Sequence, residues 1–150
     1  MRSPFLDRLE RGVLLGDGAM GTQLYARGVP YERCFDELNL SQPALVEEIH
    51  REYLAAGAEL IETNTFGANA VRLSTHALGE KSRLLARQGA KLARNAREVV
   101  GTPAFVAGSM GPLGAALAPF GTISTAQAEA AFRASFAPWR ARMRAFSPRV

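Results

Sequence analysis

The feature that most constrains the fold of this chain is a threefold succession of a short apolar segment, a glycine-rich loop and a stretch with helical spacing. Each apolar segment leads to a polar residue, and these residues, Asp17, Thr63 and Ser109, are spaced 46 positions apart. Alternation of strand and helix predicts parallel strands joined by right-handed crossovers. The chain is therefore predicted to have an α/β fold.

The boundaries of the elements follow from glycines and capping residues. Ser41 is a candidate N-cap before Pro43, and Gly57 and Gly101 are placed to end helices. Ser124 begins a segment with the spacing of a capping box. We expect strands over residues 13–15, 60–66 and 104–107, and helices over residues 5–11, 43–56, 80–99 and 124–132.

The predicted helix over residues 80–99 has two faces. Its apolar face is expected to lie inward, and its basic face is expected to be solvated. The inner residues are Leu84, Leu85, Leu92 and Val99, and the outer residues are Arg83, Arg87, Lys91, Arg94 and Arg97.

Two architectures fit this order of elements. A (β/α)8 barrel builds its site from polar residues at the carboxyl ends of consecutive strands, which is the pattern seen here. A doubly wound sheet is the competing arrangement. A complete barrel needs about 250 residues, so this chain of 150 residues would supply the first three βα units of an incomplete barrel.

Composition and charge limit the possible partners. Hydrophobic residues make up 47% of the chain and charged residues 21%, as in soluble globular proteins. The net charge of +4 arises in residues 133–150, which hold five arginines and no acid, so the body offers no footprint for nucleic acid. The apolar runs are too short to cross a membrane, and the first residues lack the apolar core of a signal peptide, so we expect a cytoplasmic protein.

The first glycine-rich loop suggests a site for an amino acid. Backbone N–H groups in a tight glycine turn can form a nest for a carboxylate, and Gly18 and Ala19 occupy such a turn. The carboxylate of Asp17 would attract an ammonium group. Aspartate also satisfies neighbouring amides in many turns, and this structural role is the alternative for Asp17.

The other two loops offer smaller polar groups. Thr63 and Thr65 share one direction along a strand, whereas Glu62 and Asn64 share the other. Threonine is common in strands, so a structural role is the alternative for each of them. Ser109 and the glycines that follow it lack the spacing and the lysine of a phosphate-binding loop.

The residues that most often bind metals are few. The sequence has a single cysteine, Cys34, and two histidines, His50 and His76, none with a partner at metal-binding spacing. One cysteine excludes an internal disulfide. We expect both histidines to be structural or exposed, and Cys34 is not assigned as a nucleophile.

Three ordered segments resemble the homocysteine S-methyltransferase family, which includes the homocysteine-binding domains of methionine synthase and betaine–homocysteine methyltransferase. The resemblance covers about residues 5–132. It rests on Gly16-Asp17-Gly18-Ala19-Met20-Gly21-Thr22, Ile61-Glu62-Thr63-Asn64-Thr65-Phe66-Gly67-Ala68-Asn69 and Ala107-Gly108-Ser109-Met110-Gly111-Pro112.

The resemblance implies a (β/α)8 barrel that transfers a methyl group to homocysteine, giving methionine. In this family a zinc ion held by three cysteines of the second half of the barrel binds the substrate sulfur. Asp17 would receive the amino group of homocysteine, and the backbone of Gly18 and Ala19 its carboxylate. The pocket floor would contain Thr63, Asn64, Thr65 and Ser109.

This chain departs from the family pattern in two respects. The zinc-binding cysteines have no counterpart, because Cys34 lies in the first connecting segment. Residues 133–150 also lack the charge pairing of a helix and the alternation of a strand. We therefore divide the chain into residues 1–132, the homocysteine-binding part, and residues 133–150, a disordered tail or the product of a shifted reading frame.

These departures leave the activity open at this stage. The first hypothesis is a truncated methyltransferase that is inactive alone, with no metal site and an unidentified methyl donor. The second is a non-catalytic fragment or half-barrel that requires a second chain and self-associates through open barrel edges. A third is an unrelated small-molecule enzyme on an α/β scaffold.

Overall fold

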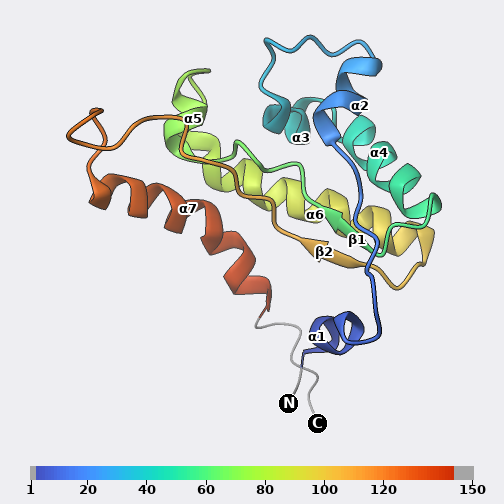
Figure 1. Cartoon of the computed structure of the whole chain (residues 1–150). Helices are drawn as coiled ribbons and strands as arrows, with labels where there is room; N and C mark the ends of the chain where they lie inside the picture. Colours follow the sequence, from blue (N-terminus) through green and yellow to red (C-terminus); the bar gives the residue numbers. More distant parts are fainter. Residues whose placement is uncertain (1–2, 144–150) are drawn as a thin grey trace.

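The computed structural model describes residues 3–143 as helices packed along a small parallel sheet (Figure 1). The order of elements alternates between strands and helices in the second half of the chain, as the sequence predicts for an α/β fold. The elements are α1 (Pro4–Leu9), α2 (Met20–Ala26), η1 (Phe35–Glu37), α3 (Leu38–Ser41), α4 (Pro43–Ala55), β1 (Leu60–Glu62), α5 (Ala70–Ser74), η2 (Gly79–Lys81), α6 (Ser82–Val100), β2 (Phe105–Ala107) and α7 (Thr125–Met143).

The sheet brings the three glycine-rich loops to one edge. β1 and β2 pair in parallel, with Ile61 opposite Val106. Gly16 forms a parallel bridge with Leu60, and the N–H of the next residue donates to the Leu60 carbonyl at 2.9 Å. The three segments thus lie side by side in chain order, and their carboxyl ends point the same way (Figure 1).

Two of the predicted strands are shorter than expected. The segment 13–15 is not a strand, and Val13 is 91% exposed; the first parallel segment consists of the bridge at Gly16. β1 ends at Glu62 rather than at residue 66, because Thr63 and Thr65 direct their hydroxyls into side-chain hydrogen bonds and the Thr65 N–H turns back to the Thr63 carbonyl. The early end of β1 leaves three polar residues, Thr63, Asn64 and Thr65, in a loop over the edge of the sheet.

The core lies between α4, α6 and the sheet. One cluster joins Leu38, Val46, Ile49 and Leu92, and another joins Ile61 to the alanines of α6. Burial of a side chain of this size stabilises the fold by about 1.5–3 kcal/mol. Figure 1 shows α6 lying along β1 and β2, with α4 beside it.

The ends of α4 and α6 test the predicted caps. The prediction of Ser41 as N-cap was wrong: it is the last residue of α3, its hydroxyl donates to Glu37, and Gln42 precedes α4. Gly57 and Gly101 both adopt positive φ, of 103° and 73°; Gly101 directly follows α6, and Gly57 follows α4 after one residue, Ala56. Glycine takes this conformation without steric cost, so both predicted helix ends are confirmed.

Only two of the four residues predicted for the inner face of α6 are buried. Leu85 and Leu92 are buried, but Leu84 and Val99 are 50% and 66% exposed. The inner positions are mainly alanine and glycine, which let α6 approach the sheet closely. Arg94, expected on the solvated face, is half-buried and lines a cavity beside Ser109.

α7 runs beyond the end predicted for it. Ser124 and Gln127 form the predicted capping box, with reciprocal hydrogen bonds of 2.8 and 3.2 Å. The predicted end at residue 132 was wrong: residues 133–143 continue the helix, so the expectation of a disordered tail fails for them. Arg133 pairs with Glu129, and Ser135 is buried and donates to the Ala68 carbonyl. The rest of the tail, 144–150, lies outside the described residues.

None of the helices within residues 3–143 combines the length and the apolar character that a membrane span requires.

His50 is a buried histidine in α4 without a hydrogen-bond partner. It is 0% exposed, and neither ring nitrogen is paired within the described residues. Burial lowers its pKa from 6.5 to about 4. The folded state therefore disfavours the protonated imidazole, as desolvation of a cation predicts.

Replacing His50 with leucine is expected to remove a pH dependence of stability. Because the pKa of His50 is lower when folded, the unfolded chain binds more protons between pH 6.5 and 4, and stability falls by about 3 kcal/mol as the pH falls through this window. Asp17, whose pKa is raised on folding, acts in the opposite direction, so the difference between wild type and His50→Leu isolates the histidine. Urea unfolding at several pH values measures it, and a constant difference would contradict the prediction.

Candidate functional site

A cavity of about 540 Å3 opens at the carboxyl ends of the three parallel segments. Six residues predicted from the sequence line it together: Asp17, Gly18, Ala19, Thr63, Asn64 and Ser109. The seventh, Thr65, lines an adjacent, mainly apolar cavity of about 280 Å3 next to α6 and α7. The cavity is of the size that proteins use for small ligands.

Asp17 is half-buried in this cavity and has a perturbed acidity. Its Oδ2 accepts a hydrogen bond from the Glu62 N–H at 3.0 Å. Burial raises the pKa of Asp17 to about 6, this hydrogen bond opposes the rise, and the negative charge of Glu62 adds to it. At neutral pH Asp17 is thus a carboxylate without a cationic partner among residues 3–143, which suits the binding of an ammonium group.

Glu62 is a cavity residue that sequence reasoning did not assign. If the strand continued, the side chains of Glu62 and Thr63 would point to opposite faces of the sheet. β1 instead ends at Glu62, and both residues line the cavity. Its Oε2 accepts a hydrogen bond from the Ser109 hydroxyl at 2.7 Å. Two carboxylates, Asp17 and Glu62, therefore stand at the same end of the cavity. The available signal in the sequence was the run of polar residues that begins at Glu62.

Thr63, Thr65 and Ser109 form a closed ring of hydrogen bonds. The Ser109 N–H donates to Thr63 Oγ1 at 3.1 Å, and Thr65 Oγ1 donates to the Ser109 carbonyl at 2.7 Å. The remaining contact, 2.7 Å between the two hydroxyls, must then be donated by Thr63. Both threonines are buried and both hydroxyl protons are used, so their role is to fix the Ser109 loop against β1.

Breaking this ring with Thr65→Val, which keeps the shape of the side chain, is expected to destabilise the fold by about 1–3 kcal/mol. The change leaves the proton of the buried Thr63 hydroxyl without an acceptor and the part-buried Ser109 carbonyl without a donor. Thr75→Val is the matched control, because the Thr75 hydroxyl bonds to a carbonyl at the exposed end of α5. Urea unfolding compares the two, and equal losses would contradict the role of the ring.

Asn64 connects the site to the helices. Its amide nitrogen donates to the Phe35 carbonyl at 2.8 Å and to Asn39 Oδ1 at 3.2 Å, and Asn39 Nδ2 donates back to the Asn64 carbonyl at 2.7 Å. Both side chains are buried. The amide nitrogen of Asn64 therefore has a structural role: it joins the loop after β1 to η1 and α3.

The first loop keeps two backbone donors available. Neither the Gly18 N–H nor the Ala19 N–H donates a hydrogen bond within the described residues. Gly18 lies against Tyr53, where a Cβ would come within 2.8 Å of the phenolic oxygen, and that hydroxyl donates to the Ala19 carbonyl. The loop is thus held in place while its N–H groups remain unpaired, as a carboxylate site requires.

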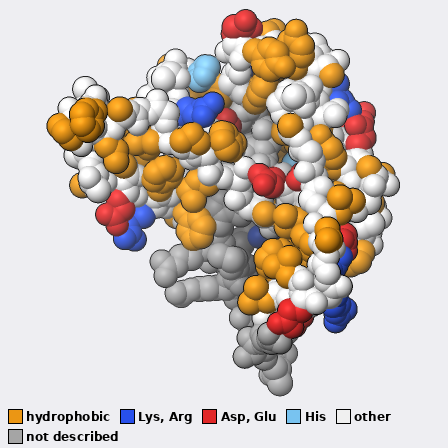
Figure 2. Space-filling view, in the orientation of Figure 1, with side chains coloured by type: hydrophobic (Ala, Val, Ile, Leu, Met, Phe, Trp, Pro, Cys, Tyr) orange, Lys and Arg blue, Asp and Glu red, His pale blue; other side chains and the backbone are white. Residues whose placement is uncertain are grey.

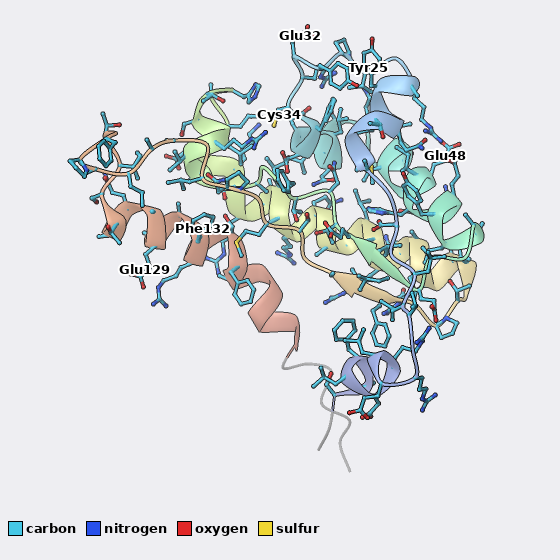
Figure 3. All side chains as sticks on the ribbon, in the orientation of Figure 1. Tyr25, Glu32, Cys34, Glu48, Glu129 and Phe132 are labelled. Atoms are coloured by element: carbon cyan, nitrogen blue, oxygen red, sulfur yellow. The ribbon has the colours of Figure 1, made fainter. Side chains whose placement is uncertain are left out.

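The residues of this chain do not fit a thiolate-rich zinc site. Cys34, the single cysteine of the sequence, lies on the loop that precedes η1 (Figure 3). Burial raises the pKa of its thiol, which disfavours the thiolate that a metal requires. No group of three or more histidine, cysteine or acidic side chains with the geometry of a metal site occurs in the described part of the chain.

Comparison with known proteins places the chain among methyltransferases. The model of the family described as homocysteine S-methyltransferase matches residues 14–146. Methionine synthases of Mycobacterium tuberculosis and Mycobacterium leprae are each 42% identical over 118 residues, which is 71% of this chain and 10% of each relative. The chain thus spans about a tenth of the length of these curated relatives.

Solved structures agree with the sequence comparison. The homocysteine methyltransferase MmuM from Escherichia coli is 32% identical; its oxidised form has a TM-score of 0.67 over 75% of this chain and 42% of MmuM. Its metallated form has a TM-score of 0.64 over 73% of this chain and 42% of MmuM. The family match extends through the whole of α7, beyond the boundary at residue 132 expected from the sequence. The chain belongs to the homocysteine S-methyltransferase family.

Proposed function

We propose that this chain is the part of a homocysteine S-methyltransferase that binds the amino-acid end of homocysteine. Its three parallel segments would be the first three βα units of a (β/α)8 barrel. The observation that carries the proposal is the half-buried Asp17 beside the unpaired N–H groups of Gly18 and Ala19, at the mouth of the cavity. An acid next to backbone donors is complementary to a zwitterion.

In this proposal each polar group has a role in binding. Asp17 accepts a hydrogen bond from the substrate ammonium group, and Glu62 adds a second negative charge beside it. The Gly18 and Ala19 N–H groups receive the carboxylate. Ser109, fixed by the threonine ring, holds Glu62 in position through its hydroxyl. The side chain of homocysteine then extends into the remaining cavity.

The transfer of a methyl group requires the thiolate of homocysteine as nucleophile. Within residues 3–143, no group of three or more histidine, cysteine or acidic side chains has the geometry of a metal site, and burial raises the pKa of the Cys34 thiol, which disfavours a thiolate. We therefore propose that the chain binds and orients homocysteine but does not transfer a methyl group by itself. The methyl donor stays unassigned, because no described feature selects one.

The alternative is a half-barrel that functions only with a second chain or a second copy. β2 pairs with β1 along one edge, and its other edge pairs with no strand within residues 3–143. Such an edge can accept a further strand. Sedimentation of the purified chain tests this alternative: a monomer at micromolar concentration would contradict self-association.

Titration calorimetry of wild-type protein with L-homocysteine between pH 5 and 8 tests the proposed function. Binding requires ionised Asp17, whose pKa is about 6, so the affinity is expected to be constant above pH 7 and to fall about tenfold per pH unit well below pH 6. Methionine formation, assayed with S-methylmethionine and added zinc, is expected to be absent. Undetectable homocysteine binding at millimolar ligand would contradict the proposal.

A further inference from the structure

We infer that Arg72 is a carboxylate-binding residue of the Asp17 cavity, so that the cavity binds an ammonium group at one end and an anion at the other. The inference rests on the proposed function, because it concerns the same cavity. It adds a residue to which neither the family match nor the sequence motifs assign a role.

The side chain of Arg72 is held at the cavity wall. Its backbone N–H donates to Asn69 Oδ1 at 2.9 Å, which fixes the first turn of α5. Its guanidinium lies over the Phe66 ring, 5.8 Å from the centroid. Its aliphatic part packs against Gly114, where an added Cβ would be 3.4 Å from the Arg72 Cβ and Cγ. The guanidinium is therefore positioned before any ligand binds.

The guanidinium donors of Arg72 have no hydrogen-bond acceptor in the described part of the chain. Its guanidinium has five N–H groups, and none of them forms a hydrogen bond or ion pair within residues 3–143. The positive charge of Arg72 acts on a nearby acid, Asp36. Burial raises the pKa of Asp36, and the charges of Arg72 and His76 partly oppose this rise. Arg72 and Asp36 form no ion pair within residues 3–143, and Asp36 Oδ1 accepts the Gly67 N–H at 2.9 Å.

The cavity is lined by three acids and three basic side chains: Asp17, Asp36 and Glu62, and Arg33, Arg72 and His76. Asp17 and Glu62 stand where the strands end, whereas Arg72 and His76 come from α5 and the turn that follows it. In Figure 2, a blue and a pale-blue side chain lie together above the middle of this face, and red side chains lie at its hollow. A ligand with one cationic and one anionic group would match this arrangement.

A carboxylate is the anion that the geometry favours. A guanidinium binds a carboxylate through two parallel N–H···O bonds, and stacking on an aromatic ring keeps its edge available. The cavity of about 540 Å3 is large enough for homocysteine and a further small molecule. The carboxylate is therefore either that of homocysteine or that of a methyl donor bound beside it.

Calorimetry on Arg72→Gln separates these two sources. The probes are L-homocysteine, 3-aminopropane-1-thiol, which is homocysteine without its carboxylate, and glycine betaine added to protein saturated with homocysteine. If Arg72 binds the substrate carboxylate, the variant loses at least tenfold in affinity for homocysteine and none for the aminothiol. If it binds a donor carboxylate, homocysteine binds normally and the affinity for betaine falls at least tenfold. Arg87→Gln, an exposed arginine of α6, is the control and is expected to change none of these values.

The outcomes distinguish this inference from the proposed function. Unchanged affinities of Arg72→Gln for both carboxylates, with normal homocysteine binding by the wild type, would overturn the role of Arg72 and leave the role of Asp17 intact. An equal loss for homocysteine and the aminothiol would also overturn it, because a carboxylate contact cannot affect a ligand without one. Absence of homocysteine binding by the wild type would overturn both proposals. Circular dichroism of each variant establishes that the fold is retained.

Discussion

Replacing Asp17 with asparagine is expected to weaken the binding of L-homocysteine by about 10- to 100-fold at pH 7.5. The change keeps the size of the side chain and its hydrogen bond from the Glu62 N–H but removes the charge that meets the ammonium group. A hydrogen bond to a charged group contributes about 1.5–3 kcal/mol, which corresponds to this loss. Calorimetry at constant ionic strength measures it.

The control for this variant is Glu48→Gln. Glu48 is exposed on α4, away from the cavity, and loses the same charge (Figure 3). Its affinity for homocysteine is expected to equal that of the wild type. Asp17→Asn should also abolish the fall in affinity below pH 6, since that fall reports the titration of Asp17. An unchanged pH profile would show that another group binds the ammonium.

Replacing Gly89 with valine is expected to destabilise the fold by about 3 kcal/mol or more. Gly89 lies on the inner face of α6, where a Cβ would be 2.6 Å from Thr65 Cγ2 and 2.8 Å from Asn39 Nδ2. The Asn64 carbonyl lies 3.3 Å from the same point. These neighbours are buried and hydrogen-bonded, so the helix must move away from the site, and overpacking of this kind typically costs 1–3 kcal/mol before the hydrogen bonds are counted.

Arg87→Val is the matched control for Gly89→Val, because Arg87 is exposed on the same helix. In Arg87→Val, valine replaces a better helix former at a cost of about a few tenths of a kcal/mol and meets no steric conflict, whereas valine has a higher helix propensity than glycine, so helix propensity cannot explain a loss of stability in Gly89→Val. Urea unfolding of both variants isolates the packing effect. A Gly89→Val protein as stable as Arg87→Val would contradict the close contact between α6 and the loop after β1.

The sequence predicted the order of the strands and the position of Asp17, because glycine loops and apolar runs are local signals. It did not predict that Glu62 faces the cavity. Alternation assumes that a strand continues, and β1 ends at that residue. The hydrogen-bonded ring of Thr63, Thr65 and Ser109 could not be predicted from the sequence either. Ser109 is 44 and 46 positions from the two threonines, and no local pattern indicates that they pair.

The end of α7 was also predicted wrongly, because it depends on contacts between residues far apart in the sequence. Pro138 and the lack of acids after Arg133 both argue locally against a helix. The structure continues the helix, and Ser135 packs against the Ala68 carbonyl and α6. Tertiary contacts thus outweigh the local propensity. His50 was expected to be structural or exposed; the structure buries it, with no hydrogen-bond partner among residues 3–143.

The position of bound homocysteine tests the central claim most directly. A titration of the 15N-labelled protein with L-homocysteine, followed by NMR, locates the ligand through changes in amide shifts. The account predicts that the largest changes occur at Gly18, Ala19, Glu62 and Ser109, with none at exposed residues of α6 such as Arg87. Saturable changes confined to another surface, or no changes at millimolar homocysteine, would contradict it.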